Sequence, residues 1–453
     1  MICLRQPQPG TVPGRKQQTG RPVSTLQQDQ DRVQRFVMSR LCRVKKLVLT
    51  AISDVRDRQG KRHTIDQMFV ALVCGVLTGS KSMRGIEKLT KYLGLGRRGE
   101  GISDTALAAL LVRLPETAGL PILVKQVKDM ARRGALAAVG LRQHWVAIDG
   151  KYVSLEHFAG GIATLMHNVN QTVYWRAGFL RACLVSAAGR PALGQFAMGD
   201  KTGEITNLPE FIRWLREQYG ELVRNITLDA GLWSKALFAE LDQCGFRVLA
   251  GIKDNKPELF AEVQRVFRIA RAAKNAKPAA ETPWVPCRTG RIRRQVWRLG
   301  SLQGWNGWDK LRQVILVVQT TRASDGSSEQ QELRYFATNA TTDLLSPQET
   351  LELVRRHWAI ENDCNWTFDV EFGEDAGRLC TGNKAVFVLG IVRMIAYNIM
   401  QWLRKEHVQV QHKYNKPTPR PWADLMDLID KALCQVGSEF WPRIRMATVR
   451  VQM

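Results

Sequence analysis

The segment from residue 141 to residue 256 alternates between two hydrophobic patterns in an order that few folds accommodate. Three runs rich in β-branched and aromatic residues come first and predict strands: HWVAIDGKYVSL, QTVYWRAGFLRACLVSA and RPALGQFAM. They are followed by an amphipathic helix, a short buried strand, a second helix and a last strand: LPEFIRWLREQYG, ITLDAG, SKALFAELDQCG and RVLAGIK. Three consecutive strands followed by β-α-β units predict a mixed α/β sheet with flanking helices.

The rest of the chain divides into segments of different character. Residues 1–45 are rich in Gln, Arg, Pro and Gly, which is typical of a disordered basic tail. Residues 46–137 have a helical pattern and indicate a small helical domain. Residues 257–345 contain the strand-like stretches QVILVVQTT and ELRYFATNA and indicate a β-rich insertion. The helical pattern resumes over 346–405, and a basic C-terminal segment spans 406–453.

The charge balance narrows the class of partner. The 453 residues include 66 Lys and Arg against 42 Asp and Glu, which gives a net charge of +24. A surplus of this size is typical of proteins that bind a polyanion, and it favours nucleic acid over an anionic membrane surface.

Cysteine usage and hydropathy indicate a soluble cytoplasmic protein. The nine cysteines are scattered with no CxxC pair, so the sequence supports neither a zinc knuckle nor a disulfide framework. The N-terminal residues lack the apolar stretch of a signal peptide. The apolar run AVFVLGIVRMIAYNIMQWL contains Arg393 and Asn398, so we expect a buried helix and not a membrane span.

Two aspartates occupy unusual places in the predicted sheet. Asp149 lies within the strand WVAIDGKYV, and Asp229 ends the strand ITLDAG. Asp is disfavoured in strands, and an unpaired buried carboxylate costs free energy. Each residue taken singly could be a turn-forming Asp. Because they lie on separate strands of one predicted sheet, at edges that β-α-β sheets commonly use for chemistry, the two together indicate a shared site.

A third carboxylate comes from the acid-rich stretch HWAIENDCNWTFDVEFGEDAGR at residues 357–378. On an α-helix, Glu361 would share one face with His357 and Asn365, close to packed apolar residues. Asp369 is a rival candidate. The other acids, namely Asp363, Glu371 and Glu374, are expected to be solvated. Three carboxylates from two strands and a helix can hold one or two Mg²⁺ ions for phosphoryl transfer.

These residues resemble bacterial insertion-sequence transposases of the DDE type, in the branch of H-repeat-associated proteins. The acid-rich stretch follows the family pattern HWxIENxLHWxLDVxFxEDxxR, with Cys364-Asn365 in place of the usual Leu-His. His357 stands where related transposases often carry a phosphate-contacting Arg. Further family blocks appear in order as AIDGK, KTGEITNLPEF, LDA and IKDNKP.

The resemblance implies a ribonuclease-H-like fold with Asp149, Asp229 and Glu361 as the acidic triad. The catalytic domain would then comprise 141–256 and 346–405, interrupted by the β-rich insertion, with 46–137 as a DNA-binding domain. We expect two Mg²⁺ ions, with Mn²⁺ as a substitute.

The expected function is a DNA transposase that cuts at the ends of an insertion sequence and joins the 3′-OH to target DNA. It would work as a homodimer in the DNA complex, associated with the bacterial nucleoid. Two alternatives stay open: a ribonuclease-H-like nuclease without strand transfer, and an inactive domesticated copy that only binds DNA. Trp358 is expected either to stack on a base or to lie in the core. The residues expected to contact DNA are Lys253, Asn255, Lys256, His357, Trp358, Asn362 and Arg378.

Overall fold

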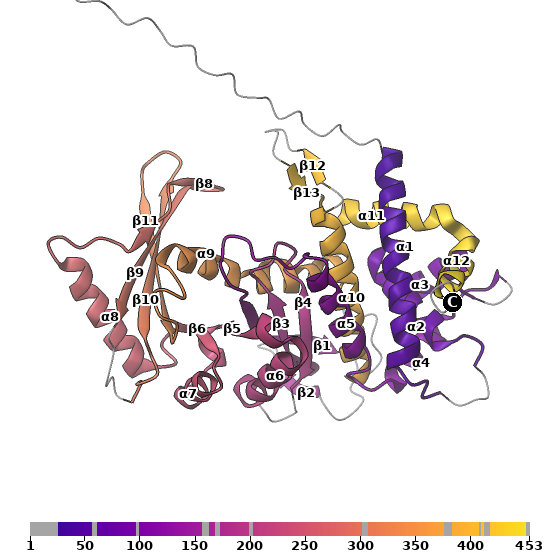
Figure 1. Ribbon diagram of the computed structural model, residues 1–453, viewed down its shortest axis with the longest axis horizontal. Helices are drawn as coiled ribbons and strands as arrows, with labels where there is room; N and C mark the ends of the chain where they lie inside the picture. The colour runs from indigo at the N-terminus through magenta and orange to yellow at the C-terminus, as the bar shows by residue number, and fades with distance from the viewer. Residues whose placement is uncertain are drawn as a thin grey trace, which may run out of the picture.

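The computed structural model describes residues 26–56, 61–96, 99–155, 163–167, 173–198, 203–300, 307–375, 383–406, 409–411 and 417–449. A large mixed sheet extends from the middle of the molecule to one end (Figure 1). Its strands follow the order β2-β3-β1-β5-β6-β11-β10-β9-β7, and β4 pairs with β3. In chain order, the first six strands are β1 (Val146–Leu155), β2 (Ala163–His167), β3 (Val173–Leu184), β4 (Ala192–Ala197), β5 (Asn225–Leu228) and β6 (Arg247–Ile252).

The pairing within the core sheet confirms the predicted fold class. β3 is antiparallel to both β1 and β4, whereas β5 lies parallel to β1 and to β6. β1, β3 and β4, with the short β2 also antiparallel to β3, form an antiparallel unit that two parallel strands extend, the arrangement expected of a ribonuclease-H-like sheet. The parallel strands are joined through helices, as the sequence predicts. These are α6 (Glu204–Tyr219) with the short turn η2 (Gly220–Val223), and η3 (Ala230–Leu232) with α7 (Lys235–Gln243).

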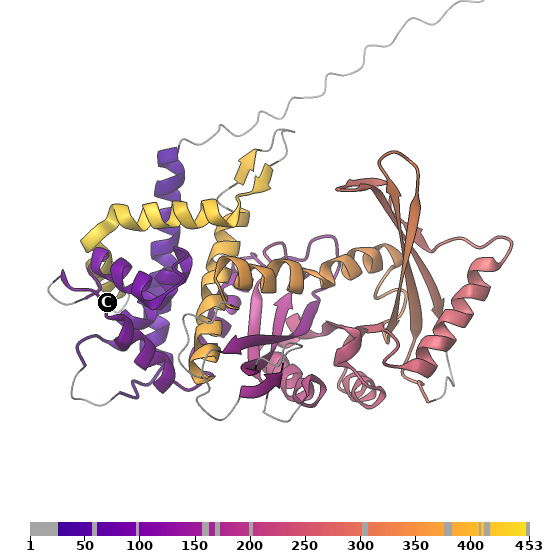
Figure 2. The ribbon, with the colours of Figure 1, turned by 180° about the vertical axis from the view of Figure 1, so that it is seen from behind.

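The segment expected to be a β-rich insertion continues the same sheet. It begins with a helix, α8 (Pro257–Ala272), and not with a strand. Its last strand, β11, then pairs antiparallel with β6, so the insertion extends the core sheet at that edge. Figure 2 shows the long strands of this part at one end of the molecule. They are β7 (Ala280–Glu281), β8 (Val285–Cys287), β9 (Gly290–Gly300), β10 (Gln313–Ala323) and β11 (Glu329–Thr338).

The chain returns to the core sheet through α9 (Pro347–His357), which begins with the predicted capping box of Ser346 and Glu349. After the π-helical stretches η4 (Ile360–Asn365) and η5 (Thr367–Glu371), α10 (Asn383–Glu406) runs through the interior. Residues Lys384–Lys405 are long and apolar enough to cross a membrane, yet the apolar window is entirely buried inside the protein. The buried Asn398 bonds both the amide and the carbonyl of Ala192. The prediction of a buried core helix is therefore confirmed.

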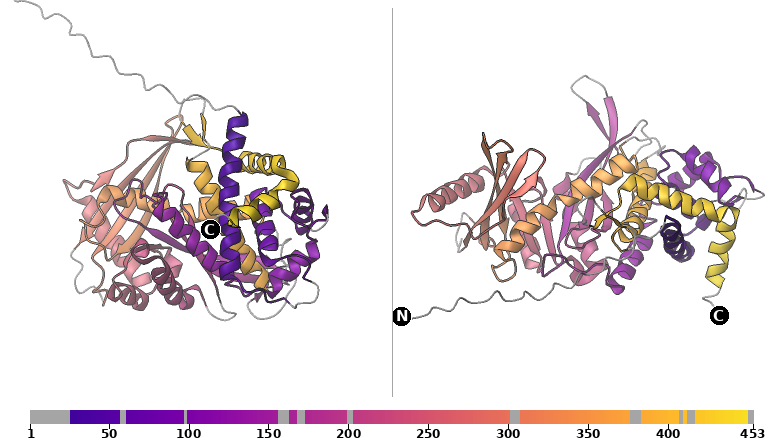
Figure 3. Two further views of the ribbon diagram at one scale, coloured as in Figure 1. Left: turned by 45° about the vertical axis from the view of Figure 1, so that its right-hand side comes forward. Right: turned by 90° about the horizontal axis from the view of Figure 1, so that it is seen from above.

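Helices from both ends of the chain pack together at the other end of the molecule (Figure 3). α1 contacts α2, α11 and α12. The expectation of a disordered tail up to residue 45 is therefore wrong for residues 26–45, and the C-terminal segment includes packed helices. The elements are α1 (Leu26–Ala51), α2 (Ile65–Leu77), α3 (Met83–Tyr92), α4 (Asp104–Arg113), α5 (Leu120–Arg132), β12 (Gln409–Gln411), β13 (Pro417–Pro419), α11 (Trp422–Val436), η6 (Gly437–Glu439) and α12 (Phe440–Val449).

Candidate active site

Asp149 and Asp229 lie side by side in the sheet. In the parallel pair of β1 and β5, Ile148 is the partner of Leu228, and the next residue of each chain segment is an aspartate. Neighbouring strands are about 4.8 Å apart, so this register brings the two carboxylates to adjacent positions. They stand where β5 ends, and beyond this point β1 continues with β3 as its partner strand and, among the described residues, no partner on the β5 side.

Electrostatics connects these aspartates with Glu361. Burial, together with the charges of Glu361, Glu204 and Asp229, raises the pKa of Asp149 to about 7. The pKa of Glu361 is also raised, by burial and by Asp229, with Lys253 and Arg334 acting in the opposite direction. Glu361 and Asp229 therefore both act on the pKa of Asp149, and Asp229 also acts on the pKa of Glu361.

Glu204 is a fourth acid at this place, and the sequence analysis did not single it out. It is the first residue of α6, and burial followed by Asp229 raises its pKa, with Arg176 and a hydrogen bond from Tyr152 opposing. A Cβ added at Gly150 would lie 2.1 Å from the Glu204 Oε1, so a side chain at this position would displace the Glu204 carboxylate from its place beside Asp149. An acid in the first turn of a helix is common because it complements the helix dipole. The sequence therefore offered no reason to place Glu204 near the two aspartates.

The segment that carries Glu361 is a π-helix and not the expected α-helix. The wider turn of η4 changes the spacing at which residues share a face, so the expected α-helical spacing of His357, Glu361 and Asn365 is wrong. Glu361 is exposed, whereas His357 and Asn365 are buried. The Asn365 amide instead reaches β1, where its Nδ2 donates to the Asp149 Oδ2 at 3.0 Å. π-Helical turns occur frequently at functional sites.

Comparison with known proteins decides the family. Residues 145–399 match the model of the transposase DDE domain, and this range includes every carboxylate described above. The chain belongs to the DDE transposase family. Among its relatives is "Putative transposase YncI" of Escherichia coli O157:H7, 23% identical over 78% of this chain and 86% of that protein. "H repeat-associated putative transposase YhhI" of Escherichia coli K12 is 22% identical over 79% of this chain and 90% of that protein.

Three of the residues expected to contact DNA in this transposase lie in the loop before α8. The Lys253 ammonium is exposed and lies 3.5 Å from the Asp229 Oδ2. The Asn255 amide and the Lys256 ammonium donate to the Ala230 carbonyl, at 2.8 Å and 2.7 Å. Asn255 and Lys256 therefore hold the turn that follows Asp229, while Lys253 has its charge at the open side of the site.

The remaining expected DNA contacts differ in their exposure. His357 is buried, its ring bonds the Thr227 hydroxyl, and burial lowers its pKa to about 4. A neutral buried imidazole does not support the expected DNA contact. Trp358 is half-buried, with the Arg334 guanidinium 4.9 Å from its ring centre. Asn362 is exposed. Arg378 lies outside the described residues.

The other acids of the stretch 357–375 are largely engaged in ion pairs. Asp369 bonds the Lys151 ammonium at 2.6 Å, and Asp363 pairs with Arg190. Glu374, which we expected to be solvated, is buried between two guanidinium groups. The structural reason is that Arg181 and Arg393 are themselves buried and need a counter-charge.

The donor set of this transposase suits a divalent cation of the kind that DDE domains generally use. Among the residues that the structure describes, no three His, Cys, Asp or Glu side chains are grouped closely enough to hold a metal ion. Carboxylate oxygens are nevertheless the ligands that Mg²⁺ prefers. The pKa values of Asp149 and Glu361 are raised first by burial and then by neighbouring carboxylates, so a bound cation would favour the ionised form of both. The residues therefore fit a divalent cation in chemistry and charge.

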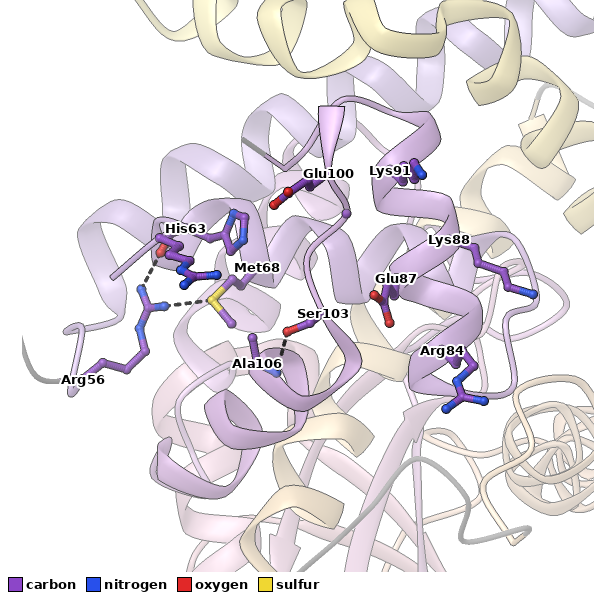
Figure 4. Close-up of a pocket in the computed structure, with 12 residues that line it drawn as sticks. Arg56, His63, Met68, Arg84, Glu87, Lys88, Lys91, Glu100, Ser103 and Ala106 are labelled. Carbon is purple, nitrogen blue, oxygen red and sulfur yellow. Dashed lines mark hydrogen bonds between the residues drawn. The ribbon is translucent and has the colours of Figure 1, made fainter. Parts of the chain in front are cut away.

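A second feature relevant to a DNA partner lies in the N-terminal helices. A hollow of about 650 Å³ is bordered by cationic side chains and by the acids Glu87 and Glu100 (Figure 4). Arg84, Lys88 and Lys91 are exposed and follow one face of α3 at helical spacing. On the opposite side, Arg56 is fixed by bonds to the His63 carbonyl and the Met68 sulfur.

Proposed function

We propose that this protein is a DNA transposase that cuts phosphodiester bonds at element ends and joins the freed 3′-OH to target DNA. The observation that carries the proposal is the register of β1 and β5, which makes Asp149 and Asp229 neighbours. The influence of Asp229 on the pKa of Glu361 supports the inclusion of the third acid. The acidic triad of the proposed reaction is thus Asp149, Asp229 and Glu361.

The chain's own groups would hold the cations and orient the DNA. Two divalent ions, Mg²⁺ or Mn²⁺, supply Lewis-acid stabilisation of the phosphate charge when bound. Asp149, Asp229 and Glu361 would hold them, and Lys253 would face a phosphate at the open side. No side-chain nucleophile is required, because water attacks in cleavage and the 3′-OH attacks in joining. Pairing two ends calls for a homodimer in the DNA complex, acting on DNA in the cytoplasm.

A strand-transfer assay with the DNA flanking the gene tests this proposal. The purified protein is incubated with labelled element ends, plasmid target and Mg²⁺. We expect a joined product. Cleavage without joining would instead support the ribonuclease-H-like nuclease, and binding without cleavage would support an inactive DNA-binding copy. An EDTA reaction serves as the control for metal dependence.

The cationic face of α3 is proposed to bind the DNA backbone. Each phosphate contact contributes about 0.9 to the slope of log affinity against log salt for duplex DNA. The double variant Lys88→Ala with Lys91→Ala should therefore reduce that slope by about 2. Fluorescence anisotropy at several salt concentrations measures it. The matched control is Lys125→Ala with Lys128→Ala, two exposed lysines of α5 outside the hollow. Equal slopes for both double variants would contradict the assignment of the α3 face.

Metal affinity should depend on pH near neutrality. The Asp149 carboxyl has its pKa raised to about 7, so below that pH it holds a proton that a cation must displace. Lowering the pH from 8 to 6 should weaken Mn²⁺ binding by roughly tenfold, since each pH unit below the pKa costs up to about tenfold. Electron paramagnetic resonance of free Mn²⁺ measures it. Asp149→Asn should bind weakly with a flatter profile, and equal wild-type affinities at pH 6 and pH 8 would contradict this prediction.

A further inference from the structure

Asn365 links the proposed metal site to the protein interior through two directed hydrogen bonds. Its Nδ2 donates to the Asp149 Oδ2 at 3.0 Å, and its Oδ1 accepts from the Arg181 Nη1 at 2.9 Å. A guanidinium can only donate and an ionised carboxylate can only accept. The two partners therefore fix which way the amide points.

Arg181 is in turn held by a buried ion triad. Its Nη2 lies 3.0 Å from both oxygens of Glu374, and the Arg393 Nη1 lies 3.6 Å from the Glu374 Oε1. All three side chains are at most 2% exposed. The Phe368 ring lies 4.2 Å from the Arg181 guanidinium carbon and covers it. The group that orients Asn365 is thus enclosed by β3, the π-helical segment and α10.

The pairing register of β1 and β3 would allow Arg181 to contact Asp149 directly. Arg181 of β3 is the direct cross-strand partner of Asp149 of β1. Side chains at such positions share a face of the sheet, so a direct ion pair would be the simplest contact. The Arg181 guanidinium instead donates hydrogen bonds to Glu374, Gln195 and Asn365. Asp149 accepts a hydrogen bond from the neutral Asn365 amide, which orients the carboxylate without neutralising its charge.

We propose that Asn365 is a positioning residue that orients the Asp149 carboxylate for metal binding, with the buried Arg181–Glu374–Arg393 triad as its anchor. This inference rests on the proposed function, because Asp149 is taken as a metal ligand. Residues that orient a ligand from behind commonly contribute a factor of 10 to 100 in metal affinity or activity.

The test compares three variants of the full chain. Asn365→Ala removes both hydrogen bonds. Asn365→His restores the pattern, because a neutral imidazole has one donor for Asp149 and one acceptor for Arg181. Asn398→Ala is the matched structural control, since it removes a buried asparagine of α10 that bonds backbone atoms away from the carboxylates. Mn²⁺ affinity, thermal midpoint and DNA affinity in EDTA are measured for each.

We expect Asn365→Ala to weaken Mn²⁺ binding 10- to 100-fold while DNA affinity in EDTA stays within about twofold. Asn365→His should recover most of the Mn²⁺ affinity, and Asn398→Ala should lower the thermal midpoint without this loss. Mn²⁺ affinity within about threefold of wild type in Asn365→Ala overturns the inference. If Asn365→Ala does not fold, the Asn365→His variant tests the inference alone. A folded Asn365→His variant that binds Mn²⁺ weakly would then overturn the inference. A wild-type protein that binds Mn²⁺ but joins no DNA contradicts the proposed function alone.

Discussion

Glu361→Gln should reduce DNA cleavage by on the order of a thousandfold while DNA binding survives. The substitution keeps the size of the side chain but removes one negative charge from a site that depends on charge to hold metal. Glu361 is exposed on η4, so the change leaves no buried group without a partner. Binding to DNA should persist because phosphate contacts come mainly from lysine and arginine side chains. A cleavage assay in Mg²⁺ and a gel shift on the same preparation measure the two effects.

Asp369→Asn is the control for this experiment. Asp369 lies on the next π-helical stretch, η5, but its carboxylate is bonded to Lys151, and it is not among the acids that raise the pKa of Asp149. We expect this variant to retain activity within about tenfold of wild type, the loss of one partly exposed ion pair being a small effect. An inactive Asp369→Asn variant alongside a normally cutting Glu361→Gln variant would show that the wrong carboxylate was chosen.

The fold could be predicted where local pattern and tertiary structure agree. The strands around Asp149 and Asp229 have the β-branched runs of buried strands, and the structure places strands there. Their adjacency followed from a general rule, since parallel strands end at a common edge. The α1 helix was missed although its pattern was present: Val33, Val37, Leu41 and Val44 are spaced every three or four residues and are all buried. The Gln- and Arg-rich composition of that region outweighed this spacing.

The details of the site depended on contacts that local pattern does not contain. A π-helix and an α-helix have the same local composition, so the turn at Glu361 is decided by packing against the sheet. The burial of Glu374 is decided by Arg181 and Arg393, which come from two other elements. The role of Glu204 likewise depends on Gly150 and Asp229, far away in the chain. A sequence readily predicts which residues have the required chemistry. It predicts less readily which of those residues come into contact in the fold.

Glu374→Gln should destabilise the protein by about 3–5 kcal/mol, which is the usual cost of removing one partner of a buried ion pair. The glutamine keeps the shape of the side chain, but Arg181 and Arg393 would then stand 0% and 2% exposed without a counter-charge. The thermal midpoint should fall on the order of 10 °C for a domain of this size. Calorimetry of the full chain without DNA measures it.

The chain contains a matched exposed triad for comparison. Glu221 pairs with Arg216 and Arg224, the same Arg–Glu–Arg composition, but its side chain is 68% exposed. Water solvates all three groups when the pairing is lost, so Glu221→Gln should cost less than about 1 kcal/mol. The expected contrast arises from burial and not from the number of ion pairs. Equal shifts in the two variants would show that the interior around Glu374 admits water, and the anchor that we assign to Asn365 would then be a weak one.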